Sequence, residues 1–195
     1  MEDRFLKHVQ EYPAVSGKHT STPTQYFDMF SSIATESFYV LDIPQKQFCY
    51  VKPDDLFLCG YSAGDALRLG YDFYSKIVYP EDLSLWTDMH KAVVRYFKDF
   101  EKKRDEIDYF CCTFRLQRKY SFHIRPLPQM VYHRMKYIWE DNELRYLVCS
   151  VGRSTVKEAG NLRMYNKDGL TYEEYSFTTG RWKLKTKEAL TEREK

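Results

Sequence analysis

The chain has 195 residues, in which 30 Lys and Arg residues nearly balance 28 Asp and Glu residues, giving a formal net charge of +2. This balance argues against a surface dedicated to nucleic acid, although it is compatible with a local basic patch. Aromatic residues make up 17% of the chain, which excludes collagen-like, low-complexity and wholly disordered proteins. No apolar run approaches the roughly 20 residues that span a bilayer, and the acidic N-terminus does not resemble a secretory signal. We therefore expect a soluble, cytoplasmic protein.

Residues 1–36 are expected to form an N-terminal helical flank. Its second helix begins after Thr24 and has an apolar face that includes Phe27, Phe30 and Ile33, a pattern typical of packing or dimerisation. Residues 37–52 then predict a β-hairpin, because two short β-rich runs are separated by a polar turn. We expect a homodimer, with the N-terminal helix as its contact.

The pattern becomes helical between residues 54 and 100. Ser62 lies three residues before Asp65, a capping arrangement that starts a short helix. Pro80 and the acidic residues after it start a long helix that extends to about Phe100, because Pro and negative charge are favoured in a first helical turn.

Strand patterns dominate from residue 107. Apolar residues alternate with polar ones over the first run, and Tyr132–Trp139 and Leu144–Val151 predict an antiparallel hairpin. The prediction is an α+β fold over residues 37–152, with a five-stranded antiparallel sheet and helices inserted between strands 2 and 3. N-terminal helices and a C-terminal extended segment flank it.

This order of elements resembles that of PAS sensory domains. Leu58-Cys59-Gly60-Tyr61-Ser62 resembles the junction between the short helices of that family, and Val78-Tyr79-Pro80-Glu81-Asp82-Leu83 resembles the start of its long helix, with Tyr79 where His is usual. The resemblance implies a PAS-like fold and a sensory role. It implies no catalytic residues.

The C-terminal part carries two further signals. Residues 153–188 predict a linker or hairpin, in which Arg181, Lys183, Lys185 and Lys187 alternate with other residues and would share one face of a strand. That face is expected to be a solvated edge or a contact with DNA phosphates. Residues 189–195 resemble the start of a LuxR-type helix-turn-helix domain, which leads us to expect a chain truncated before its DNA-binding domain.

Ser62 also lies in Gly60-Tyr61-Ser62-Ala63-Gly64, which matches the G-x-S-x-G motif of α/β-hydrolases. A hydrolase would use Asp82 or Asp105 with His123 or His133. The sequence lacks the alternating β/α units of that fold, and the capping role explains Ser62, so no enzymatic activity is expected. The five cysteines have no CxxC spacing and form no zinc pattern with the histidines, so neither a metal nor a cofactor is predicted.

An apolar cavity between the sheet and the long helix is the candidate binding site. Its candidate lining residues are Tyr50, His90, Phe110, Cys112, Phe114, Leu116, Met135 and Tyr137. Such a cavity suits a small organic ligand, and the same rings could instead fill it as a solid core.

The preferred interpretation is a sensory domain of a cytoplasmic transcription regulator. Binding of a ligand or partner would shift the population of its conformations and reposition a DNA-binding domain outside this chain. The alternative is a PAS-like dimerisation or protein-interaction scaffold with a filled core and no ligand.

Overall fold

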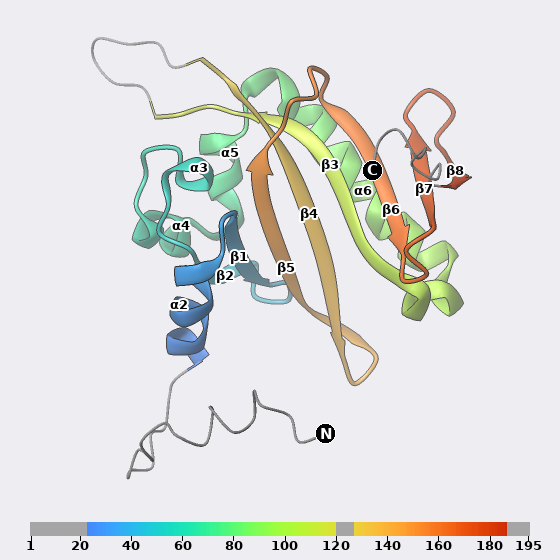
Figure 1. Cartoon of the computed structure of the whole chain (residues 1–195), viewed down its shortest axis with the longest axis horizontal. Helices are drawn as coiled ribbons and strands as arrows, with labels where there is room; N and C mark the ends of the chain where they lie inside the picture. The colour runs from blue at the N-terminus through green and yellow to red at the C-terminus, as the bar shows by residue number, and fades with distance from the viewer. Residues whose placement is uncertain (1–22, 120–126, 187–195) are drawn as a thin grey trace, which may run out of the picture.

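The computed structural model describes residues 23–119 and 127–186. Their strands form one antiparallel sheet in the order β2-β1-β5-β4-β3-β6-β7-β8 (Figure 1). The strands are β1 Ser37–Asp42, β2 Gln47–Val51, β3 Ile107–Leu116, β4 Gln129–Glu140, β5 Glu143–Arg153, β6 Gly160–Asn166, β7 Thr171–Ser176 and β8 Arg181–Thr186. The helices are α2 Pro23–Ile33, α3 Asp55–Leu58, α4 Ala63–Leu69, η1 Gly70–Phe73, α5 Tyr74–Ile77, η2 Pro80–Asp82, α6 Leu83–Asp99 and η3 Glu101–Glu106.

The predicted five-stranded, PAS-like sheet is wrong, because the sheet of the described residues has eight strands. The difference lies in the C-terminal segment, which was expected to be a separate extended piece. Its first strand, β6, pairs antiparallel with the edge of β3 that β4 leaves free, and β7 and β8 extend the sheet further. An unpaired strand edge offers a row of backbone N–H and C=O groups, and β6 satisfies them.

Helix α6 packs along the inner face of the sheet. Its buried residues Met89, Val93 and Tyr96 belong to one core cluster together with the inner residues of β3 and β4. Met89, Val93 and Tyr96 recur at helical spacing, so a single stripe of α6 meets the sheet. On the β8 side, the ring of Trp182 lies 5.1 Å from that of Tyr96, and the Tyr96 hydroxyl donates a 3.0 Å hydrogen bond to Glu173.

The short helices close the core at the β1–β2 end of the sheet. The predicted capping box of α4 is present, because Ser62 and Asp65 bond to each other's backbone N–H groups. Gly70 ends α4 with φ +57°, and a Cβ there would lie 2.6 Å from the Lys46 carbonyl oxygen. Only glycine fits this close approach of the η1 turn to the β1–β2 turn.

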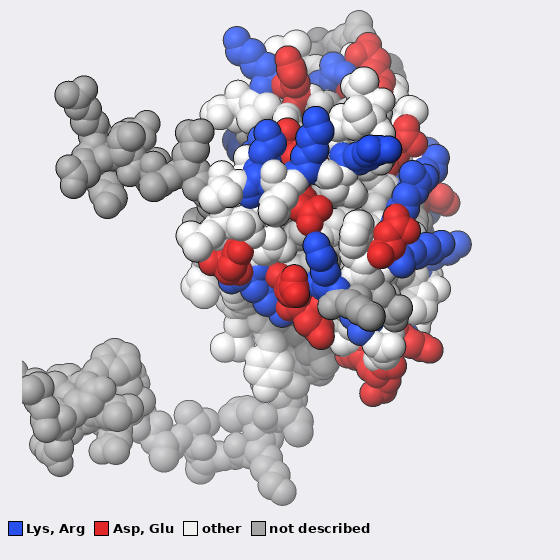
Figure 2. Space-filling model, turned by 90° about the vertical axis from the view of Figure 1, so that its right-hand side faces the viewer, with Lys and Arg blue, Asp and Glu red and all other residues white. Residues whose placement is uncertain are grey.

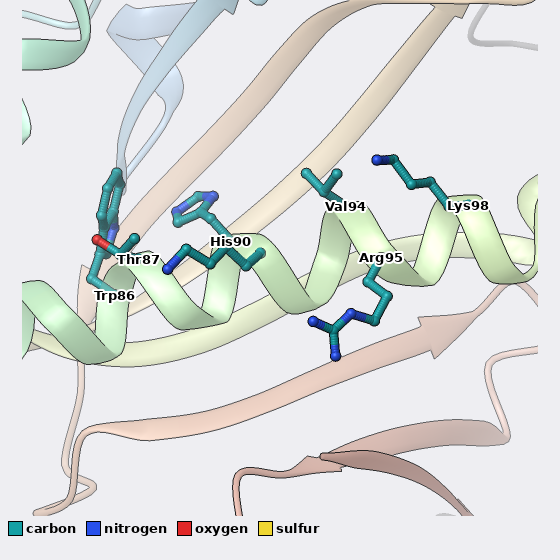
Figure 3. A pocket seen from close by; sticks show the side chains of 7 residues that line it. Trp86, Thr87, His90, Val94, Arg95 and Lys98 are labelled. Atoms are coloured by element: carbon teal, nitrogen blue, oxygen red, sulfur yellow. The ribbon is translucent and has the colours of Figure 1, made fainter.

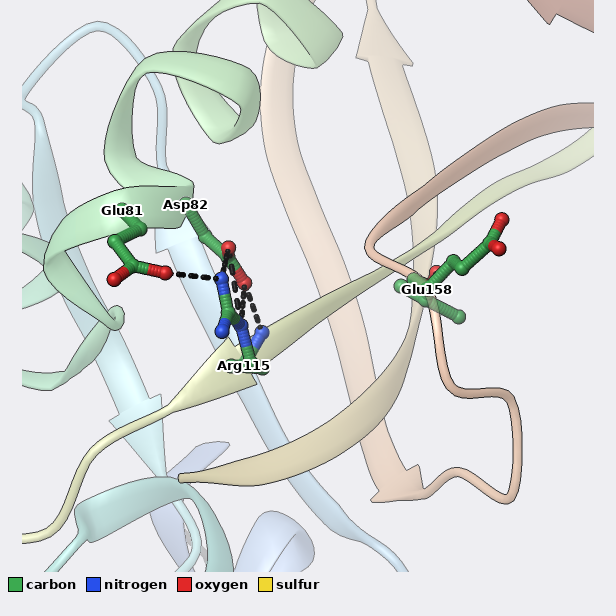
Figure 4. Close-up of polar contacts among 5 residues, drawn as sticks. Glu81, Asp82, Arg115 and Glu158 are labelled. Atoms are coloured by element: carbon green, nitrogen blue, oxygen red, sulfur yellow. Dashed lines mark hydrogen bonds and ion pairs between the residues drawn. The ribbon is translucent and has the colours of Figure 1, made fainter. Parts of the chain in front are cut away.

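A buried ion pair fixes the start of α6 on the sheet. The Asp82 side chain is almost fully buried and accepts hydrogen bonds from the backbone N–H, Nε and Nη2 of Arg115 on β3 (Figure 4). Arg115 also bonds to Glu81 at 3.1 Å and stacks 4.3 Å from the ring centre of Tyr79. Hydrogen bonds to the Asp82 and Glu81 carboxylates, and the negative charge of both, raise the pKa of the Arg115 guanidinium, so it stays charged.

We predict that Arg115→Ala lowers the free energy of unfolding by about 3 kcal/mol, because it leaves the Asp82 carboxylate buried with its guanidinium partner removed. Glu81→Gln is the control, since Glu81 is exposed and its removal is expected to cost less than about 0.5 kcal/mol. Urea unfolding followed by circular dichroism measures both. Equal, small losses for the two variants would show that the pair does not hold α6.

Candidate functional site

A chain of polar side chains crosses the core beneath α6. The Tyr74 hydroxyl donates to the Tyr39 hydroxyl at 2.7 Å, and the Tyr39 hydroxyl lies 2.6 Å from Nε2 of His133. His133 on β4 is fully buried, and its Nδ1 lies 4.0 Å from the sulfur of Cys112. Burial lowers the pKa of His133 to about 3, so the imidazole is neutral at pH 7.

Two buried nitrogen atoms on α6 differ from the polar side chains just described, because they have no hydrogen-bond partner among the described residues. These atoms are Nε1 of Trp86 and Nε2 of His90. The two rings are neighbours, with centroids 4.3 Å apart, and the Trp86 ring also lies 4.6 Å from that of Tyr74. Burial lowers the pKa of His90 to about 4. A buried polar group without a partner costs about 1–3 kcal/mol, so this pair needs an explanation.

A groove runs along α6 over these two rings. It consists of two hollows of about 440 and 450 Å³ that share Val94 and Lys98. The first lies over Trp86, His90 and Val94, and the second extends to Trp139 and Leu144 on the β4–β5 hairpin. Figure 3 shows Trp86, His90 and Val94 on the same side of the helix, as expected from their spacing of four residues.

The rim of this groove is basic. Lys91 is paired with Asp88 at 3.3 Å, whereas within residues 23–119 and 127–186 neither Arg95 nor Lys98 forms an ion pair. At the far end, the Arg104 guanidinium stacks 4.3 Å from the ring centre of Trp139. Apolar walls, two unsatisfied buried nitrogens and free positive charges suit a small organic molecule that carries a hydrogen-bond acceptor or an acid.

The structure brings most of the predicted lining residues together. Six of them lie on the inner face of the sheet and belong to the core cluster or pack against it: Phe110, Cys112, Phe114, Leu116, Met135 and Tyr137. His90, a seventh, faces them from α6. The six residues pack tightly, and a pocket of only about 20 Å³ beside Phe110 and Tyr137 leaves room for roughly one water molecule. The open space lies along α6 instead.

Tyr50 does not join this group. It lies on the opposite face of the sheet, where its ring packs against Phe27 and Phe38 and its hydroxyl donates to Asp28 at 3.1 Å. A β-bulge between Val40 and Leu41 changes the pairing register, so that Phe48 joins the inner core and Tyr50 the outer cluster.

Sequence reasoning missed Tyr39, Tyr74 and His133 as members of the site. A signal for His133 existed, because it alternates with Met135 and Tyr137 and therefore shares their face of β4. Sequence reasoning also missed Trp86 as a member of the site.

The other candidate chemistry is absent from this region. The Ser62 hydroxyl is hydrogen-bonded to Asp65 at the exposed start of α4, and the five cysteines are free. Within the described residues, no group of three or more His, Cys, Asp or Glu side chains could hold a metal ion. No described helix is long and apolar enough to cross a membrane. The LuxR-like residues 189–195, with Lys187, lie outside the described residues.

Comparison with known proteins identifies no relative, since no family model, curated protein or solved structure matches this chain.

The buried His133 predicts a specific pH dependence of stability. Its pKa is about 3 when folded and about 6.5 when unfolded, so the unfolded state binds the extra proton between these values. The free energy of unfolding should therefore fall as pH is lowered from about 6.5, by about 1.4 kcal/mol per pH unit from this group. Between pH 6.5 and 4.5, the free energy of unfolding of His133→Gln should fall by about 2–3 kcal/mol less than that of wild type. Parallel curves for the two proteins would contradict the burial of a neutral imidazole.

Proposed function

We propose that this chain is the sensory module of a cytoplasmic LuxR-type transcription regulator, and that it acts by binding a small organic molecule in the groove along α6 rather than by catalysis. The observation that carries the proposal is the pair of buried nitrogens of Trp86 and His90, which have no hydrogen-bond partner among the described residues. They lie beneath an open groove whose rim carries Arg95 and Lys98, neither of which is ion-paired within the same residues. The resemblance of Leu58–Ser62 and Val78–Leu83 to sensory domains, and of residues 189–195 to a LuxR-type domain, supports the regulatory context.

Helix α6 can connect the groove to the C-terminal strands. One side of the helix borders the groove, whereas Tyr96 on another side contacts Trp182 on β8 and bonds to Glu173 on β7. A ligand that favours one position of α6 therefore also favours one position of the β7–β8 hairpin. Residues 189–195, with their resemblance to a LuxR-type domain, follow this hairpin in the sequence, so the hairpin is suited to pass the change to a DNA-binding domain.

We predict that Trp86→Phe weakens binding of the ligand by about tenfold or more, because it preserves the ring but removes the Nε1–H donor. The ligand is found by a thermal-shift screen of small organic acids, and its affinity is measured by isothermal titration calorimetry. Tyr146→Phe is the control, since it also keeps the ring and removes a polar hydrogen but lies with the cluster on the opposite face of the sheet, and it should bind within about twofold of wild type. The proposal fails if no compound in the screen shifts the melting temperature, or if Trp86→Phe binds as tightly as wild type.

A second role, dimerisation, is favoured by the exposed face of α2. Met29 and Ile33 are 68% and 77% exposed, and Tyr26 and Phe30 extend the same apolar stripe. Large apolar side chains at this spacing on the surface of a helix are typical of a protein interface.

We predict that wild type is a dimer and that the double variant Met29→Lys/Ile33→Lys is a monomer, because two charges cannot be buried in an apolar contact. Light scattering coupled to size-exclusion chromatography measures the mass in solution. Leu184→Lys is the control, since Leu184 is also 67% exposed but lies on β8. A monomeric wild type at high concentration would rule out this interface.

A further inference from the structure

The outer face of the sheet, opposite α6, carries a row of basic residues over β4, β6 and β8. Alternation along each strand sends one set of side chains to the core and the other outward. Pairing aligns the outward sets, so that Arg163 on β6 is level with Glu174 on β7 and Lys183 on β8. The outward basic residues of these strands are Arg134, Lys136, Arg163, Arg181, Lys183 and Lys185.

Acidic side chains balance this set only in part. Lys136 pairs with Asp108 at 2.8 Å, and Arg163 with Glu174 at 3.1 Å. Arg181, Lys183 and Lys185 have no ion-pair partner in the described part of the chain. Seen from the β7–β8 side, Lys and Arg side chains lie among Asp and Glu side chains (Figure 2). The positive excess is found in the outward strand positions given by the pairing.

A ladder of tyrosines runs through this basic face. The rings of Tyr109, Tyr165 and Tyr172, on β3, β6 and β7, stack with centroids 4.9 and 5.4 Å apart. Arginines lie at both ends, with Arg134 5.6 Å from Tyr109 and Arg163 5.4 Å from Tyr172. Because the rings stack on one another from strand to strand, their faces cover each other. Such a surface favours hydrogen bonds to phosphate oxygens over stacking with bases.

We infer that this outer face, named here the Tyr–Arg face, contacts the sugar–phosphate backbone of double-stranded DNA. The inference rests on the proposed function, because a transcription regulator brings this chain close to DNA. From Lys136 on β4 to Lys185 on β8 the face spans four strand spacings, about 19 Å, which matches several successive phosphates of one strand. Contacts of this kind add affinity without sequence preference and weaken steeply with salt.

The test measures binding of the purified chain to a labelled 20-base-pair duplex of arbitrary sequence by fluorescence anisotropy, over a salt series. The variant Lys183→Glu/Lys185→Glu should bind at least tenfold more weakly at low salt, with a salt slope lower by about 2. Lys46→Glu/Lys76→Glu is the matched control, since both lysines are exposed, lie away from this face and change the net charge equally. It should bind within about twofold of wild type.

The possible outcomes separate this inference from the proposed function. Absence of duplex binding by wild type at low salt, or equal losses in the two variants, overturns the Tyr–Arg face as a DNA contact. Tighter binding of a single strand than of the duplex overturns the assignment to double-stranded DNA. The proposed function is tested separately, by measuring ligand binding to wild type and to Trp86→Phe without DNA. A failure of DNA binding therefore leaves the result for the groove unchanged.

Discussion

The contact between Asp82 and Arg115 determines how α6 lies on the sheet, and the groove depends on it. Asp82 ends the turn that starts α6, whereas Arg115 belongs to the end of β3. Backbone pairing supports the same connection, since the N–H of Tyr79 donates to the Arg115 carbonyl at 2.9 Å and the N–H of Gln117 donates to the Ile77 carbonyl at 2.7 Å. A charged pair that is this well hydrogen-bonded fixes one geometry. The helix therefore crosses the sheet at a fixed position, with Trp86 and His90 above the polar chain of the core.

The core beneath α6 combines tight packing with an unusual amount of polar chemistry. Tyr39, Tyr74 and His133 satisfy one another, which removes the cost of burying their hydroxyl groups and ring nitrogen. Trp86 and His90 are buried beside them without partners. Since unsatisfied buried groups destabilise a fold, their position beneath an open groove supports a binding role, in which the two rings turn toward a ligand that supplies the missing hydrogen bonds.

Local sequence signals predicted the local structure well. The capping box of Ser62 and Asp65 and the Pro80 start of the long helix both occur in the structure, because each depends on neighbouring residues. Strand β3 forms where it was predicted, but both of its faces are covered at its centre, where residues 110–114 are all buried. The five-stranded sheet was wrong because the pairing of β6 with β3 joins segments about 50 residues apart and depends on a free strand edge that no local pattern reveals. Tyr50 was misplaced for a related reason, since one bulge in the β1–β2 pairing changes which face each residue occupies.

The central claim is that the α6 groove holds a small molecule, and native mass spectrometry of gently purified protein tests it most directly. The account predicts a mass above that of the bare chain, which is lost when the protein is denatured and is reduced when the same preparation is made with Trp86→Phe. The bare chain mass for wild type, also after addition of the organic acids used in the thermal-shift screen, would contradict it.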